Sequence, residues 1–233
     1  MKFTRLAIYF MPAPGAFSEF ADRWLGWSAR RGVTVAHPEI AGLPHPVAAL
    51  TERPRKYGFH ATLKAPFRLA DGESLAGLRD ALQAFAATRP VAQAPGLRLA
   101  RIGAFLALMP NDDSGEIDAL AADVVEAFDP FRAPLTDADR ARRLASGLSA
   151  VQIANLDRWG YPYVMDEFRF HMTLTGPLPE AEGAQVLAAL TPWMKPLLPT
   201  PFVVDALTLA GEDVSGQFHA IERVTLAGKV TAE

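Results

Sequence analysis

The chain has 233 residues, of which 50% are hydrophobic and 21% are charged, the composition of an ordinary globular protein. Its formal net charge of −3 argues against a global basic field that would hold long nucleic acid by counterion release. Because the sequence contains no cysteine, it also excludes disulfides, cysteine-ligated zinc, iron–sulfur clusters and thiol nucleophiles.

The first part of the chain alternates strand-like and helix-like segments. Residues 6–11 form a short apolar run that predicts a buried strand, and residues 15–31 carry aromatic side chains at helical spacing. The proline-rich segment 36–55 has no clear period and predicts a loop or lid. A strand over about 56–69 and a helix over 74–87 follow.

The remainder of the chain continues this alternation. Residues 97–109 predict one or two strands interrupted at Gly103, and residues 114–128 predict a helix. Thr136 and Asp139 form a capping pattern that opens one long helix running to about Trp159. A strand over 167–175, a helix over 179–190 and strands over 202–209 and 218–226 come last. This order predicts an α+β fold, with a cleft between two mostly antiparallel sheets backed by helices.

The N-terminal segment fits a first buried strand better than a signal peptide, since its apolar run is short and soon reaches Pro12. No apolar run approaches the ~20 residues needed to span a bilayer. We therefore expect a soluble, cytoplasmic protein.

One short pattern, His-x-Thr-Leu, occurs twice, at residues 60–63 and 171–174. Each copy ends a strand-like segment containing aromatic residues, and a proline, Pro66 or Pro177, follows within a few residues. A single His-x-Thr in a strand is usually structural, but two copies in the same context are much rarer by accident. The repeat predicts a two-histidine active site.

The alternation of side chains along a strand places the His and Thr of each copy on one face and their apolar neighbours on the other. The apolar face suits packing against helices, whereas the polar face needs water or a ligand because buried polar groups require partners. The same alternation adds Lys64 beside the first pair, and Arg169 and Thr175 beside the second. Each imidazole and hydroxyl is thus accompanied by positive charge.

These groups meet the needs of phosphodiester cleavage. Histidine, with an ordinary pKa near 6.5, can act as base or acid at neutral pH. Threonine hydroxyls and cationic side chains can stabilise negative charge on the non-bridging phosphate oxygens. The scheme requires no metal, and no spacing of His, Asp and Glu in the sequence suggests a metal site.

At these residues the chain resembles the two-histidine (2H) phosphoesterase superfamily, which has two His-x-Thr/Ser-x motifs on strands facing a central cleft. Segments 56–66, 158–163 and 167–176 look like a narrower bacterial branch encoded beside phosphonate-degradation genes. The resemblance covers essentially the whole chain, 1–233. It implies one bilobal, pseudo-symmetric catalytic domain like that of the bacterial 2′-5′ RNA ligase-like (LigT-like) proteins, acting without metal or other cofactor. It also implies that His60 and His171 are acid and base and that Thr62 and Thr173 bind phosphate.

Five further residues are candidates for contacting the substrate, each with a structural alternative. Arg169 can instead form a structural ion pair, and Lys64 can be a solvated lysine at a strand end. Tyr9 can pack in the core, while Tyr57 and Tyr163 can stabilise loops. We expect a small phosphorylated substrate of nucleotide or ribose-phosphate size, and neither long nucleic acid nor a membrane as partner.

The favoured function is a phosphodiesterase that opens a cyclic phosphodiester or cleaves a small linear one. A role in phosphonate metabolism is implied by the resemblance alone. Two alternatives stay open: a non-catalytic protein that binds a phosphorylated ligand or an RNA end, and an RNA ligase or 2′-5′ phosphodiesterase acting on tRNA-like substrates. The sequence also leaves open which histidine is the base, the oligomeric state and the role of segment 36–55.

Overall fold

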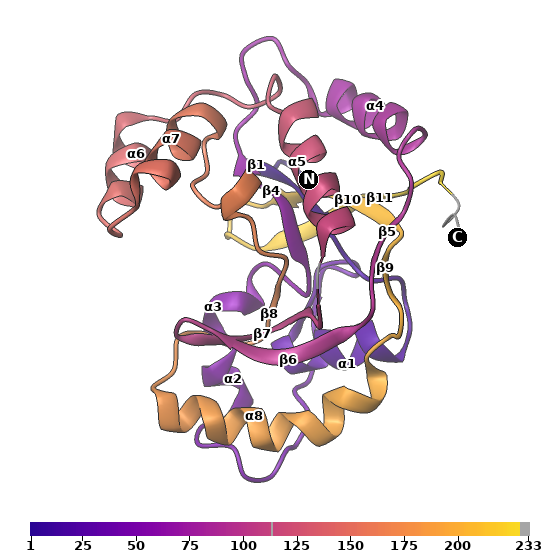
Figure 1. Cartoon of the computed structure of the whole chain (residues 1–233), viewed down its shortest axis with the longest axis vertical. Helices are drawn as coiled ribbons and strands as arrows, with labels where there is room; N and C mark the ends of the chain where they lie inside the picture. Colours follow the sequence, from indigo (N-terminus) through magenta and orange to yellow (C-terminus); the bar gives the residue numbers. More distant parts are fainter. Residues whose placement is uncertain (113, 229–233) are drawn as a thin grey trace.

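The computed structural model describes residues 1–112 and 114–228 (Figure 1). Its centre is a seven-stranded antiparallel sheet in the order β11-β10-β1-β4-β8-β7-β6. The strands, in chain order, are β1 (Arg5–Phe10), β4 (Ala61–Phe67), β6 (Leu97–Ile102), β7 (Phe105–Pro110), β8 (Met172–Thr173), β10 (Ala206–Glu212) and β11 (Phe218–Thr225).

The sheet consists of two halves that meet at one residue pair, Ala61 opposite Met172. Strands β11-β10-β1-β4 form one half and β8-β7-β6 the other, and in Figure 1 they lead into an upper and a lower lobe. The predicted α+β class with antiparallel sheets is confirmed. The two sheets expected from the sequence are joined edge to edge through this pair, which brings the two motif strands side by side.

Helices cover the two halves separately. In the upper lobe, α4 (Leu75–Ala86) packs on β10 and β11, and α5 (Gly115–Ala127) packs on β4. In the lower lobe, α8 (Glu180–Met194) packs on β6 and β7, and α1 (Ala16–Leu25) is tied to the sheet by Trp24, whose Nε1 donates to the carbonyl of Leu174 at 2.8 Å. Each of these four helices buries apolar side chains against the sheet, as in α4, where Leu78 and Leu82 are fully buried.

Several smaller elements complete the fold. The segment 36–55, expected to be a loop, contains two single-turn helices, α2 (Val47–Leu50) and α3 (Glu52–Arg55). Two short antiparallel ladders join β2 (Trp27–Ser28) to β3 (Val33–Thr34) and β5 (Ala92–Ala94) to β9 (Phe202–Val204). Short 3₁₀ turns lie at Met165–Glu167 and Lys195–Leu197.

The expectation of one long helix from Thr136 to Trp159 is wrong. The structure has two helices, α6 (Asp137–Leu144) and α7 (Ala150–Trp159). The Thr136 cap is present, since its side chain accepts from the Asp139 amide. Between the helices, Gly147 adopts φ +75°, a conformation that glycine takes readily, and Ser149 opens a second helix with a full capping box.

Both motif strands are shorter than the predicted ranges 56–69 and 167–175. Strand β4 begins at Ala61 and β8 at Met172, so each histidine lies immediately before its strand. The carbonyls of Gly58 and Arg169 accept hydrogen bonds from the imidazoles of His60 and His171. These two carbonyls therefore bond to a side chain and not to a neighbouring strand. The ladder therefore starts one residue after each histidine.

Other boundaries also shift. Helix α1 ends at Leu25 because Gly26 follows in the left-handed conformation at φ +80°, and the predicted strand over 202–209 divides into β9 and β10. In the described part of the chain, no helix is long and apolar enough to cross a membrane.

Candidate active site

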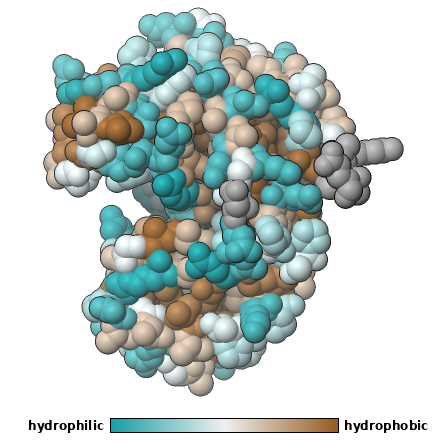
Figure 2. All heavy atoms as spheres, in the orientation of Figure 1, coloured by the Kyte–Doolittle hydropathy of each residue, from teal (hydrophilic) through white to brown (hydrophobic). Residues whose placement is uncertain are grey.

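A cleft of about 360 Å³ lies where the two halves of the sheet meet. Figure 2 shows the surface hollowed at the left edge, between the upper and lower lobes. The His and Thr of both motifs, His60 and Thr62 from the first and His171 and Thr173 from the second, line this cleft. The pairing of β4 with β8 thus brings together two motifs that are far apart in the sequence.

The two imidazoles are held in the same way. Nδ1 of His60 lies 2.9 Å from the carbonyl oxygen of Gly58, and Nδ1 of His171 lies 2.7 Å from that of Arg169. A carbonyl can only accept, so Nδ1 carries the proton in both rings, and Nε2 of a neutral ring keeps its lone pair. Each motif therefore fixes the tautomer that leaves Nε2 able to take or return a proton.

His60 lies in an aromatic environment. Its ring centroid is 4.0 Å from that of Tyr9 and 5.9 Å from that of Tyr57, and the Thr62 hydroxyl donates to Nε2 at 3.2 Å. Burial, with a smaller effect from the nearby His171, lowers the pKa of His60 to about 4, although the bond to the Gly58 carbonyl opposes the change. At neutral pH His60 is an uncharged imidazole.

The aromatic ring beside His171 lies farther away than the ring that stacks on His60. The ring of Phe105 lies 5.8 Å away, and the backbone of Thr173 pairs with Ala107 of β7. Burial lowers the pKa of His171, while the bond to the Arg169 carbonyl raises it. Both histidines are therefore less basic than a free imidazole, for the same physical reason.

Two of the five candidate substrate contacts lie in the cleft. Tyr9 is fully buried, stacks on His60, and has a hydroxyl without a hydrogen-bond partner among the described residues. Burial raises the pKa of Tyr9 well above its usual value, so the hydroxyl stays protonated. Tyr57 also lines the cleft and packs against Phe218 at 5.0 Å.

The other three candidates lie elsewhere. Arg169 is exposed and its guanidinium turns back onto the carbonyls of Asp166 and Phe168. Lys64 is buried, and its Nζ donates to the Val125 carbonyl at 2.9 Å, tying β4 to α5. Register shifts between β1 and β4 change the simple alternation that placed Lys64 beside Thr62. Tyr163 is 44% exposed and packs edge-on against Tyr161.

Several cleft residues are not among the substrate contacts chosen from the sequence. Arg5 on β1, Arg53 on α3 and Arg143 on α6 all line the cleft, as do Tyr161 and Phe105. The basic cluster around Arg143 was visible in the sequence, but a solvated helix face is the usual meaning of such a cluster. Arg53 lies in the proline-rich segment, which carries no periodic signal. Only the tertiary fold brings these side chains to the motifs.

The chemical character of the lining is basic and aromatic. Among the described residues that line the cleft there is no Asp or Glu, and no group of three or more potential metal-ligating side chains occurs in the described part of the chain. Carboxylate oxygens are the usual ligands of hard cations. The donors present, imidazole and hydroxyl, suit proton transfer and hydrogen bonding to an anion.

Comparison with known protein families assigns the chain to one of them. A family model described as "Protein of unknown function (DUF1045)" matches residues 62–219, which include Thr62, His171 and Thr173. The chain belongs to this family. The antiparallel α+β fold, and two His-x-Thr motifs on adjoining strands of one cleft, agree with the two-histidine phosphoesterase resemblance noted from the sequence.

Two curated relatives carry the description ribose 1,5-bisphosphate phosphokinase PhnN. One, from Janthinobacterium sp. (strain Marseille), is 38% identical over 233 residues, which cover 97% of this chain and 51% of the relative. The other, from Laribacter hongkongensis (strain HLHK9), is 36% identical over 188 residues, which cover 79% of this chain and 43% of the relative. The chain thus spans about half the length of the curated relatives it matches.

The solved structures that the chain matches are more distant in sequence. TT0787 of Thermus thermophilus has a TM-score of 0.43 and 14% identity, with 97% of this chain and 99% of that chain covered. LigT of E. coli, solved in complex with 3′-AMP, has a TM-score of 0.42 and 15% identity, with the same two coverages.

Proposed function

We propose that the chain is a metal-independent phosphoesterase that hydrolyses a cyclic or small linear phosphodiester by paired-histidine acid/base catalysis. The observation that carries the proposal is the matched presentation of His60 and His171. Both rings line one cleft, and both have Nδ1 bound to the carbonyl two residues earlier. Two imidazoles with Nε2 available for proton transfer are what in-line displacement at phosphorus needs, one on the side of attack and one on the side of departure.

In this mechanism His60 is the base, because its neutral state at pH 7 leaves Nε2 able to accept a proton. It takes the proton of a water molecule as the water oxygen bonds to phosphorus. The bond from phosphorus to the leaving oxygen breaks, and protonated His171 gives its Nε2 proton to that oxygen. A bound anion favours the protonated form of His171, because opposite charge raises the pKa of an imidazole. A proton exchange with solvent restores both rings.

Thr62 and Thr173 supply the phosphate contacts in this scheme. Each follows its histidine by two residues and lines the same cleft, so each hydroxyl can donate to a non-bridging oxygen as negative charge builds. Tyr9 contributes its ring, which stacks on His60, while its protonated hydroxyl is buried. The Thr62 hydroxyl, which donates to Nε2 of His60 in the free protein, turns to the phosphate oxygen when substrate binds, and this frees Nε2 to accept the proton of water.

The size of the cleft favours a small substrate. A volume of about 360 Å³ lies at the low end of the range for small-molecule sites, about 300–1,000 Å³. We therefore propose a substrate of nucleotide or ribose-phosphate size rather than long nucleic acid. The name of the longer relatives, a ribose 1,5-bisphosphate phosphokinase, supports a role beside ribose phosphates, and we propose that this role is in phosphonate metabolism.

The test is turnover of a panel of 2′,3′-cyclic nucleotides, linear diesters and ribose cyclic phosphates, measured by release of the monoester with and without EDTA. We expect turnover that EDTA leaves unchanged and a bell-shaped dependence of kcat/KM on pH. Activity abolished by EDTA and restored by a divalent cation would overturn the metal-independent mechanism. Tight binding of the panel without turnover would instead identify a non-catalytic binding protein.

A further inference from the structure

The cleft carries more positive charge than a phosphodiester requires. Arg5, Arg53 and Arg143 line it together with the two histidines, and no acidic side chain among the described residues shares that lining. The whole chain has a net charge of −3, so this local excess runs against the average of the molecule. A phosphodiester carries a single negative charge, for which the paired histidines and threonines already provide contacts.

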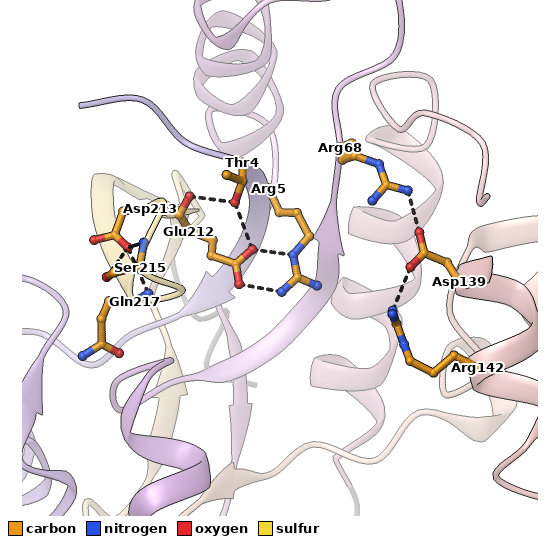
Figure 3. A network of polar contacts seen from close by, with 9 residues as sticks. All are labelled: Thr4, Arg5, Arg68, Asp139, Arg142, Glu212, Asp213, Ser215 and Gln217. Atoms are coloured by element: carbon orange, nitrogen blue, oxygen red, sulfur yellow. Dashed lines mark hydrogen bonds and ion pairs between the residues drawn. The ribbon is translucent and has the colours of Figure 1, made fainter. Parts of the chain in front are cut away.

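The three arginines differ in whether their charge is already balanced. Arg5 is held by Glu212 through two bonds, at 2.5 Å from Nε and 2.6 Å from a terminal nitrogen, as Figure 3 shows. Its guanidinium charge is therefore neutralised within the protein. In the described part of the chain, neither Arg53 nor Arg143 forms an ion pair or a side-chain hydrogen bond. These two are the unbalanced charges of the cleft.

Arg143 is placed as a binding group would be. It is half-buried at the end of α6, and its guanidinium carbon lies 4.7 Å from the ring centroid of Tyr161, another cleft residue. Stacking on an aromatic ring limits the motion of a guanidinium while leaving its edge N–H groups free to donate. Its neighbour Arg142 is instead bound by Asp139 at 2.8 Å, a contact drawn in Figure 3.

Arg53 approaches the cleft from the lower lobe. It lies on α3, and its aliphatic stem runs beside Gly176, which follows the second motif; a Cβ at Gly176 would lie 3.8 Å from the Cδ of Arg53. In Figure 1, α3 and α6 belong to the lower and the upper lobe, one on each side of the hollow seen in Figure 2. Two unpaired guanidinium groups thus reach one cleft from its two lobes.

We propose that Arg53 and Arg143 form a second anion subsite, so that the substrate carries a phosphomonoester in addition to the phosphodiester cleaved at the histidines. This inference rests on the proposed function for the reaction but adds the class of substrate. A phosphomonoester carries close to two negative charges at neutral pH and accepts bidentate bonds from arginine. Two unpaired arginines match that charge. The subsite selects a small sugar or nucleoside cyclic phosphate that is also phosphorylated at another hydroxyl.

The test compares two substrates that differ by one group: adenosine 2′,3′-cyclic phosphate and its 5′-phosphorylated form. We expect the wild-type protein to have a kcat/KM at least roughly 10-fold higher for the 5′-phosphorylated compound, since hydrogen bonds to charged groups contribute about that factor or more. In Arg53→Met and Arg143→Met the ratio should fall, and in the double variant it should approach about 1.

The matched control is Arg142→Met. It removes the same side chain one residue away, but Arg142 is paired with Asp139 and does not line the cleft. Its ratio should equal that of the wild type. Thermal unfolding of each variant reports whether the change has altered the fold, and Arg53→Lys, which keeps a charge but loses bidentate geometry, should give an intermediate ratio.

A binding measurement separates this inference from the proposed reaction. Calorimetric titration with adenosine 3′,5′-bisphosphate and adenosine 3′-monophosphate needs no turnover, and we expect roughly 10-fold tighter binding of the bisphosphate, lost in the double variant. Equal kcat/KM for both cyclic substrates, or a preference that survives in the double variant, would overturn the second subsite and leave the phosphoesterase standing. The calorimetric preference without turnover of any substrate would support the subsite and overturn the reaction.

Discussion

The two motif copies hold their histidines by the same hydrogen bond, from Nδ1 to the carbonyl two residues earlier, but the surroundings of the two rings differ. His60 lies 4.0 Å from Tyr9 and accepts a hydrogen bond from Thr62, whereas the aromatic neighbour of His171 is Phe105 at 5.8 Å. Burial lowers the pKa of both rings, and for His60 the value is about 4. Because the Nδ1 contacts are equivalent, the large decrease in the pKa of His60 comes from the side chains that bury its ring.

The comparison shows how a repeated sequence can give two different proton affinities. Each motif sets the tautomer through its own backbone, and the fold then sets how much water each ring retains. Acid/base catalysis needs this inequality, because one group must start neutral and the other protonated. The difference between the copies is therefore the feature that mutations should test.

The largest effect is expected from removing either histidine. His60→Ala and His171→Ala should each lower kcat on the order of 10²–10⁴-fold, and the double variant should be little worse than the poorer single one because the two groups act as a unit. Single-turnover measurements on a 2′,3′-cyclic nucleotide would show this. Full activity in both single variants would end the paired-histidine mechanism.

The lowered pKa of His60 also predicts a pH-dependent stability. Between pH 6.5 and about 4 the unfolded chain protonates His60 while the folded chain does not, so the free energy of unfolding should fall as pH falls. The contribution is up to about 3 kcal/mol. Urea denaturation of His60→Gln across this range should show a shallower slope than the wild type, and His171→Gln a smaller change. Identical slopes for the wild type and His60→Gln would contradict the burial of this ring.

Substitution of the two motif threonines should have different effects on the pH–rate profile. Thr62→Val and Thr173→Val should each reduce kcat roughly 10–100-fold, because each loses a hydrogen bond to the charged phosphate. Thr62 also donates to Nε2 of His60, a bond that stabilises the neutral ring, so losing it should raise the pKa of His60. The acidic limb of the pH–rate profile should shift to higher pH in Thr62→Val and stay in place in Thr173→Val. Thr62→Ser should restore the wild-type profile.

The sequence was sufficient to predict most of the fold and the centre of the candidate site. Periodicity and caps placed the main helices and strands, and the repeat of His-x-Thr picked out the four side chains that meet in the cleft. Its errors have local causes. Gly147 and Ser149 divide a helix that the hydrophobic pattern left continuous, and the imidazole bonds to the Gly58 and Arg169 carbonyls shorten both motif strands.

The outer part of the site depends on contacts that no local pattern contains. Strand alternation alone placed Lys64 and Arg169 beside the histidines, yet Lys64 bonds to the Val125 carbonyl and Arg169 to its own backbone. Arg53 and Arg143 reach the cleft from elements far from either motif in the sequence. Which cation faces the substrate is decided by how the two lobes meet.

The smallest effect should come from replacing Tyr9, the aromatic neighbour of His60, by phenylalanine, the residue type that lies beside His171. Tyr9→Phe keeps the ring beside His60 and removes a buried hydroxyl that lacks a partner among the described residues, so it should raise the free energy of unfolding by about 1 kcal/mol. If that hydroxyl donates to substrate, kcat/KM should also fall roughly 10-fold.

Thr208→Val is the matched control for Tyr9→Phe. Thr208 pairs with Tyr9 across β1 and β10, and its hydroxyl is also buried and without a partner among the described residues, but Thr208 does not line the cleft. It should gain similar stability at unchanged kcat/KM. A stability gain without loss of activity in Tyr9→Phe would show that Tyr9 acts only by packing its ring against His60. The hydroxyl would then have no part in substrate binding.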